Sequence, residues 1–204
     1  MEIRKVVVGP YGVNCYVLIY PKTKDSVIVD PGADAERIMG ACRDTRVKYI
    51  LLTHSHPDHI GAVAEVRTLT RAALGVHPLD AIPVEDFVDF HLEDGSTLVV
   101  GNLEILVMHT PGHTPGSVCF QHGLDLISGD TIFPGGPGHT TSPPNLRREI
   151  QSIREKILPL SDDTRLHPGH GDSTSLGVER PAIERFLNKG GYEGLFGDVT
   201  WLGV

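Results

Sequence analysis

The chain has 204 residues, of which 40% are hydrophobic and 22% charged. This balance is typical of a folded globular protein and excludes disordered and fibrous classes, and we expect a single domain over residues 1–204. The formal net charge is −8 and no basic run is present, which argues against nucleic acid or an anionic membrane surface as the partner. We therefore expect a small-molecule partner, and the sequence defines no oligomeric state.

Cysteine usage and the N-terminal segment both indicate a cytoplasmic protein. The three cysteines, Cys15, Cys42 and Cys119, are far apart and form no C-x-x-C pair. We therefore expect free thiols in a reducing compartment and no thiolate metal site. Residues 1–10 lack the apolar core of a signal peptide, and no apolar stretch approaches the roughly 18 residues that a membrane-spanning helix needs.

In the first half of the chain, short apolar runs alternate with turn residues. Strands are predicted where β-branched and aromatic residues are bounded by glycine or proline, at residues 3–8, 13–20, 26–30 and 47–53. Helices are predicted where apolar residues recur at helical spacing, at residues 34–43 and 60–70.

The second half has the same order of strands followed by helices. Two hairpins are predicted at 96–108 and 117–128, then an amphipathic helix at 143–158 and a short strand at 164–167. A last helix is predicted at 176–187, which Pro181 starts or kinks. This repeated order suggests two sheets packed face to face with helices outside. The glycine-rich tail 190–204 carries Tyr192, Phe196 and Trp201, which we expect to cover one edge of the core.

The segment 53–61, THSHPDHIG, places three imidazoles and a carboxylate between an apolar strand and a helix. His54 and His56 are two residues apart, so in extended backbone they point the same way and can bind one ion. Asp58 and His59 follow the turn at Pro57 and can face a second ion. Since crowded imidazoles need a cation to offset the cost of burial, the segment favours a metal site over a loop of solvated histidines.

Three further candidate ligands lie at the ends of later predicted strands. Each directly follows a glycine, and they are His113, Asp130 and His170. Glycine lets the backbone approach a site closely. Alone, each would be interpreted as an ordinary loop residue. Together with the segment 53–61 they form a set of five histidines and two aspartates.

The order and separation of these motifs resemble the metallo-β-lactamase superfamily. The likeness spans residues 8–180 and is carried by H-x-H-x-D-H at 54–59, His113, Gly-Asp at 129–130 and Pro-Gly-His-Gly at 168–171. It is closest to the glyoxalase II-like branch, whose members hydrolyse hydroxyacyl thioesters. The resemblance implies an α/β (α+β) fold, namely a four-layer αββα sandwich of two mixed β-sheets flanked by helices.

The resemblance also implies a role for each candidate ligand. The first metal ion is expected to bind His54, His56 and His113. The second is expected to bind Asp58, His59 and His170, with Asp130 bridging the two ions. Because all donors are nitrogen or oxygen, we expect two divalent ions. Zinc is the expected metal, and Fe or Mn is also compatible with these donors.

Three more residues are expected near the ligands or the substrate. Asp30 matches a family position that orients a ligand imidazole from outside, and His109, four residues before His113, is a candidate for the same support. His139 stands where single-domain relatives often carry arginine. It is therefore interpreted either as a residue that contacts substrate or as an exposed loop histidine. The loop 133–144 directly follows Asp130 and is expected to help form the pocket.

The predicted activity is hydrolysis of a thioester by a metal-bound hydroxide, with Asp58 as the proton carrier. Hydroxyacylglutathione hydrolases usually add a helical C-terminal extension that holds glutathione. This chain ends soon after His170, so glutathione is not the expected thiol carrier.

Three other activities remain open at this stage. One is a mononuclear iron persulfide dioxygenase of the same superfamily, which would use His54, His113 and Asp130. Another is a phosphodiesterase or nuclease, against which the net charge of −8 counts. The third is a non-catalytic metal-binding or partner-binding protein, against which the complete ligand set counts. A secreted β-lactamase is disfavoured because position 130 is not cysteine and no signal peptide is predicted.

Overall fold

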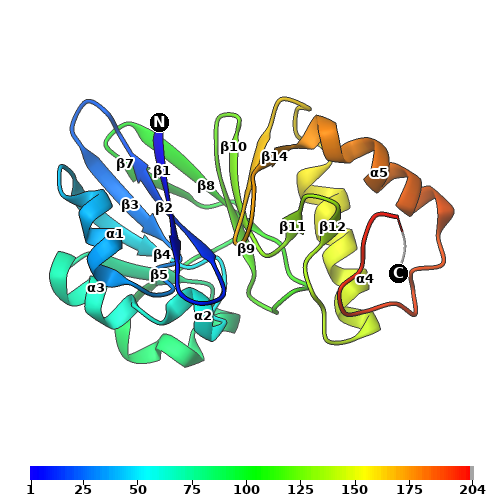
Figure 1. Ribbon diagram of the computed structural model, residues 1–204, viewed down its shortest axis with the longest axis horizontal. Helices are drawn as coiled ribbons and strands as arrows, with labels where there is room; N and C mark the ends of the chain where they lie inside the picture. Colours follow the sequence, from blue (N-terminus) through cyan, green and yellow to red (C-terminus); the bar gives the residue numbers. More distant parts are fainter. Residues whose placement is uncertain (203–204) are drawn as a thin grey trace.

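The computed structural model describes residues 1–202, so the last two residues of the predicted tail lie outside the described residues. Most strands belong to two six-stranded sheets (Figure 1). The first sheet has the order β1-β2-β3-β4-β5-β6 and is antiparallel up to β3 and parallel beyond it. Its strands are β1 (Glu2–Val8), β2 (Val13–Ile19), β3 (Asp25–Val29), β4 (Arg46–Leu51), β5 (Ala73–Val76) and β6 (Val88–His91).

The second sheet has the order β14-β13-β10-β9-β8-β7, in which only the β10–β13 pair is parallel. Its strands are β7 (Thr97–Val100), β8 (Leu103–His109), β9 (Val118–His122), β10 (Asp125–Gly129), β13 (Arg165–Pro168) and β14 (Thr174–Ser175). A separate small hairpin pairs β11 (Ile132–Phe133) with β12 (Gly136–Pro137).

Within residues 1–202, five α-helices accompany the sheets: α1 (Ala35–Cys42), α2 (Pro57–Ile60), α3 (Val63–Thr70), α4 (Pro143–Ser152) and α5 (Leu176–Lys189). Helix α4 begins at a proline after the N-cap Ser142, whose hydroxyl accepts a hydrogen bond from Asn145 N, as is typical of helix starts. It continues into a π-helical turn at 153–157. Helix α5 begins five residues before Pro181, so the alternative in which this proline starts the helix is wrong.

Three hydrophobic clusters show how these elements are layered. Strand residues alternate in direction, so Tyr16 and Leu18 of β2 face the second sheet, whereas Val17 and Ile19 face helices α1 and α3. On the far side, Leu126 of β10 packs in the cluster that α4 and α5 contribute to. Two sheets with three apolar interfaces make four layers, with α1 and α3 on one side and α4 and α5 on the other (Figure 1). The predicted αββα sandwich is confirmed.

Residues 71–95 contain elements that the sequence did not predict. They form β5, two 3-10 turns at 78–80 and 82–87, and β6. Strand β5 has four residues and includes Gly75, where a Cβ atom would lie 2.5 Å from the ring of Phe90. Such a short strand, stabilised by its neighbours rather than by its own residues, carries little local signal. No helix within residues 1–202 combines the length and apolar character needed to cross a bilayer.

Candidate metal centre

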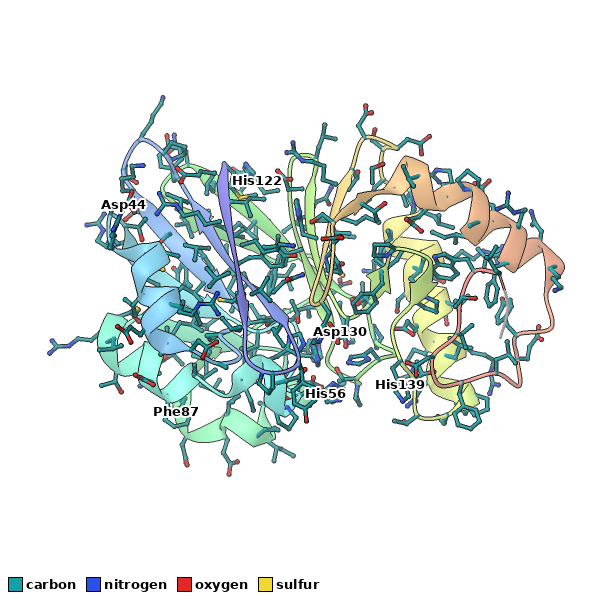
Figure 2. The ribbon with its side chains drawn as sticks, viewed as in Figure 1. Asp44, His56, Phe87, His122, Asp130 and His139 are labelled. Carbon is teal, nitrogen blue, oxygen red and sulfur yellow. The ribbon has the colours of Figure 1, made fainter. Side chains whose placement is uncertain are left out.

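The seven predicted ligands come from five places in the chain and meet along one edge of the sandwich. Figure 2 shows two of them, His56 and Asp130, at this edge between the two halves of the molecule. All are carried on segments that follow strands: His54 and His56 after β4, Asp58 and His59 on α2, His113 after β8, Asp130 after β10 and His170 after β13. Segments that follow the ends of strands are where α/β proteins commonly place their sites.

The first cluster brings three imidazole nitrogens together. His54 Nε2 lies 3.1 Å from His56 Nδ1 and 3.3 Å from His113 Nε2, and the latter two atoms are 2.9 Å apart. Three nitrogens that each bind one tetrahedral zinc at the usual bond length would be separated by about 3.3 Å. These three side chains therefore have the spacing of ligands to one shared ion.

The second cluster combines two imidazoles with a carboxylate. His59 Nε2 lies 3.3 Å from His170 Nε2. Asp58 Oδ2 lies 3.4 Å from His170 Nε2 and 3.9 Å from His59 Nε2. Nitrogen and oxygen donors in this arrangement suit a second divalent ion.

Asp130 lies between the two clusters. Its carboxylate oxygens are 3.6 Å from His113 Nε2 in the first cluster and 3.6 Å from both His59 Nε2 and His170 Nε2 in the second. Its Oδ1 atom is buried and has no hydrogen-bond partner. A buried carboxylate oxygen without a partner is costly unless a cation compensates it, so Asp130 is placed to bridge two ions.

The outer partners of four imidazoles fix where their lone pairs point. The Nδ1 atoms of His59, His113 and His170 donate to Asp30 Oδ2, His139 O and Tyr11 O, at 3.0, 2.8 and 3.0 Å. Thr53 Oγ1 donates to Asp30 and so accepts from His54 Nδ1, at 3.0 Å. In the neutral rings the inner Nε2 atoms therefore present lone pairs to one another, an arrangement that needs a cation between them. The residues fit a pair of divalent ions.

A family model described as the metallo-beta-lactamase superfamily matches residues 8–170. The chain belongs to this superfamily. It is 33% identical over 211 residues to the hydroxyacylglutathione hydrolase GloC of Haemophilus influenzae, an alignment that covers 92% of this chain and 99% of that protein.

Solved structures of superfamily members show the same fold. The B3 metallo-beta-lactamase BLEG-1 matches with a TM-score of 0.78 and 32% identity, covering 88% of this chain and 97% of BLEG-1. TTHA1623, solved in a di-iron-bound form, matches with a TM-score of 0.75 and 31% identity, covering 87% of this chain and 96% of TTHA1623. The predicted family is confirmed, and with it the assignment of this chain to a superfamily of metal-binding hydrolases.

Asp30 supports the superfamily motif from outside the two clusters. Its carboxylate accepts hydrogen bonds from Thr53 N at 2.8 Å, Thr53 Oγ1 at 2.6 Å and His59 Nδ1 at 3.0 Å. Although Asp30, His54 and His59 are close enough to share an ion, these three bonds engage both oxygens of Asp30. The geometry therefore favours the supporting role predicted for it.

Two supporting contacts escaped the sequence analysis because they involve backbone carbonyls, which every residue carries. One is the acceptor for His170 on Tyr11, and the other is the acceptor for His113 on His139. The ring of His139 is half exposed and its Nδ1 lies 2.9 Å from Asp198 Oδ1. Its contact with substrate stays a prediction.

His109 contacts the site less directly than predicted. Its ring stacks on His77 with centroids 4.0 Å apart, and its Nε2 donates to Pro115 O at 3.0 Å. In the described part of the chain, none of its hydrogen bonds or ring contacts reaches the seven candidate ligands. Its contact with the loop that carries His113 is to the backbone, and its supporting role stays a prediction.

Asp80 is a buried residue that the sequence analysis did not single out. It accepts hydrogen bonds from Ser55 N at 3.2 Å, Thr114 Oγ1 at 2.7 Å and Gly116 N at 2.8 Å. These bonds join the segment of His54 and His56 to the loop of His113, so Asp80 holds two ligand segments in register.

The charges around Asp130 favour a cation. Burial acts to raise the pKa of Asp130, but the interaction with the His59 imidazole 3.6 Å away and with the nearby imidazoles of His54 and His113 outweighs it, and the pKa lies below the usual range. Burial acts to lower the pKa of His59, but the carboxylates of Asp130 and Asp30 outweigh it and raise that pKa to about 10. Burial also lowers the pKa of His54 well below its usual range. Without metal, His59 therefore holds a second proton besides the one that its Nδ1 donates to Asp30, and metal binding must release this second proton.

The approach of the His170 loop to Asp130 requires a glycine. A Cβ atom on Gly169 would lie 2.1 Å from Asp130 Oδ1 and 2.8 Å from His59 Cε1. We expect Gly169→Ala to displace these side chains and to lower metal affinity by about 10- to 100-fold, the usual size of losses from disturbed ligand support. Titration with metal and a competing chelator measures this loss. Gly40→Ala is the control, since nothing lies within 4 Å of its Cβ position, and unchanged affinity in Gly169→Ala would contradict the prediction.

Glu149 is a fully buried carboxylic acid beneath the site. Neither carboxyl oxygen has a hydrogen-bond partner, and a Cβ atom on Gly138 would lie 2.8 Å from Oε1. Burial, with the charge of Asp130, raises the pKa of Glu149 well above its ordinary value of 4.5. The folded chain therefore keeps a proton that the unfolded chain releases above pH 4.5, so stability falls as pH rises above that value.

Glu149→Gln removes this titration and is expected to stabilise the protein at neutral pH. Each kcal/mol regained corresponds to about 2–4 °C in Tm for a chain of this size. Thermal unfolding at pH 4 and pH 7.5 should show a gain of several degrees at pH 7.5 and a smaller change at pH 4. The exposed Glu36→Gln serves as control. An equal effect at both pH values would refute the assignment of a buried proton to Glu149.

Proposed function

We propose that this chain is a dinuclear metallo-hydrolase that cleaves a thioester. The observation that carries the proposal is the pair of ligand clusters joined by Asp130, which lies 3.6 Å from members of both. Two relatives agree with it: GloC is named a hydroxyacylglutathione hydrolase, and TTHA1623 holds two irons. All seven donors are nitrogen or oxygen, so we propose Zn, with Fe or Mn also compatible.

When bound, two divalent ions would act as Lewis acids and lower the pKa of a water from about 15.7 toward 7. His54, His56 and His113 would hold the first ion, and Asp58, His59 and His170 the second, with Asp130 shared. The outer hydrogen bonds to Asp30, Tyr11, His139 and Thr53 keep four of the imidazole rings in one tautomer and orientation. This preorganisation reduces the rearrangement needed when charge develops on the substrate carbonyl.

Asp58 is proposed as the proton carrier. Its side chain is 24% exposed, against 0% for His59 and 11% for Asp130, so its carboxylate faces the open side of the site. It can accept the proton of the attacking water and release it to the departing group. Because a thiolate leaves with little protonation, the site needs no second acid for a thioester.

A substrate screen with metal analysis on the same sample tests this function. Thioesters, lactones, β-lactams and phosphodiesters are assayed under nitrogen, and oxygen uptake is followed separately with a persulfide. The proposal predicts fastest hydrolysis of thioesters with two metal ions per chain. Faster cleavage of β-lactams, as the name of BLEG-1 would suggest, or oxygen uptake with one iron per chain would overturn it.

A further inference from the structure

A pocket of about 680 Å³ opens beside Asp130 and His170. Its walls come from two segments far apart in the sequence, the loop 133–139 and the end of the tail at 198–202, with Ala182 of α5. We call it the tail pocket. Its volume is in the range of pockets that bind small molecules. The prediction that the loop after Asp130 helps to form a pocket is confirmed.

The tail is a fixed wall of this pocket. Gly197 and Thr140 exchange two backbone hydrogen bonds, at 2.8 and 3.3 Å, and Trp201 N donates to Gly135 O at 2.9 Å. Trp201 is only 3% exposed and packs in the hydrophobic cluster to which α4 and α5 contribute, as Tyr192 also does. The expectation that tail aromatics cover the core is confirmed for these two residues, whereas Phe196 is 55% exposed.

The wall of the pocket is mostly apolar. The apolar lining consists of Phe133, Pro134, Pro137, Ala182, Val199, Trp201 and Leu202. Within residues 1–202, the ionisable lining residues are Asp130, His139, His170 and Asp198, and none is lysine or arginine. The carboxylates of an anionic carrier would therefore meet Asp198 and the overall charge of −8, and no lysine or arginine of the described lining could pair with them.

Two cationic side chains line a neighbouring hollow. Arg185 and Lys189 lie there, and Trp201 and Leu202 border both hollows. An anionic group in the tail pocket would have to extend past Trp201 and Leu202 to reach Arg185 or Lys189. The described lining of the tail pocket therefore favours an apolar group over an anionic one, because it offers apolar contacts and no lysine or arginine.

We propose that the tail pocket binds an uncharged apolar group of the substrate, aliphatic or aromatic, next to the bond that is cleaved. The proposal rests on the proposed function and names the substrate class for it: thioesters without anionic groups near the scissile bond. The apolar group belongs either to the acyl part or to the thiol part of the substrate. The two sources share one chemistry, and the experiments separate them.

Binding is measured first, without any reaction. Trp201 is the only tryptophan in the sequence, so intrinsic tryptophan fluorescence reports on the pocket wall. The probes are two thioethers, S-hexyl-N-acetylcysteamine and S-hexylglutathione, which share the hexyl group and differ in charge. We expect the uncharged probe to bind at least about 10-fold more tightly, which is about 1.4 kcal/mol. Equal or tighter binding of S-hexylglutathione would overturn the proposal.

A charge placed at the rim provides a matched test. Leu202 lines the pocket and is 85% exposed, so Leu202→Lys adds a cation without disturbing the core. We expect this variant to bind S-hexylglutathione several-fold more tightly than the unchanged protein does. Phe196→Lys makes the same charge change at an exposed tail position outside the pocket lining and should have little effect. The same gain in both variants would show a general charge effect and count against the pocket.

Hydrolysis then identifies which part of the substrate enters the pocket. In one arm the acyl group of N-acetylcysteamine thioesters grows from acetyl to hexanoyl and phenylacetyl. In the other arm the acyl group stays acetyl, and the thiol becomes hexanethiol or benzyl mercaptan. We expect kcat/KM to rise at least about 10-fold along one arm, since apolar contacts add up by about this much per few methylenes. Trp201→Ala should remove this rise in kcat/KM. The Leu202→Lys variant should still bind the uncharged probe, which shows that its own pocket remains intact.

The outcomes separate this inference from the proposed function. Hydrolysis that is insensitive to group size in both arms would refute the apolar pocket and leave the hydrolase standing. Tight binding of the uncharged probe with no thioester cleaved by metal-loaded protein would refute the thioester hydrolase and leave the pocket standing.

Discussion

Replacing Asp130 with asparagine is expected to remove at least one metal ion per chain and to lower kcat/KM by at least about 10²-fold, the usual size of a lost electrostatic contribution. The carboxylate of Asp130 lies 3.6 Å from nitrogens of both clusters. An amide has the same shape but no charge, so it cannot offset two divalent cations. Metal-to-protein ratio and kcat/KM are measured on the same preparation.

The control for this variant is Asp163→Asn, the same chemical change at an exposed turn away from the site. It should keep the metal content and rate of the unchanged protein. If Asp130→Asn also kept two ions and a normal rate, the bridging role of Asp130 would be wrong.

Asp58→Asn is expected to keep much of the metal and to lower the rate of thioester hydrolysis by at least about 10²-fold, as removal of a general acid–base group typically does. The metal is retained because His59 and His170 still supply two donors, 3.3 Å apart. Comparing a thioester with its matched oxygen ester sharpens the test. A larger loss for the ester indicates that Asp58 delivers a proton to the departing group, since an alkoxide needs that proton and a thiolate does not.

An equal loss for both substrates would limit Asp58 to taking the proton from water. Turnover close to that of the unchanged protein, with full metal content, would remove Asp58 from the mechanism altogether.

The sequence predicted the strands and helices best where the local pattern is strong. The hairpin β7–β8 and the helix from residue 143 form close to where periodicity and turn residues put them. The strands within residues 71–95 were not predicted, because β5 is stabilised by parallel neighbours on both sides. Such support requires no local sequence pattern in the strand itself. The predicted last helix forms over Leu176–Lys189, and only the alternative in which Pro181 starts it is wrong, since the packing of α5 outweighs the local cost of a proline inside it.

The candidate site divides along a similar line. The crowded motif 54–59 indicates a metal site by itself, whereas the assignment of His113, Asp130 and His170 to it depended on resemblance, because residue spacing cannot show that distant loops meet. Burial of Glu149 and the fold-back of the tail onto residues 135 and 140 depend on tertiary packing alone. Short-range sequence patterns contain no information about either.

The most direct test of the paired metal centre is anomalous X-ray diffraction from crystals of the purified protein, recorded on both sides of the absorption edge of the metal it contains. We predict two peaks at bonding distance, about 2.0–2.2 Å, from the side chains. One peak should lie among His54, His56 and His113, the other among Asp58, His59 and His170. A single peak, or none, with all of these side chains ordered would contradict a two-metal hydrolase.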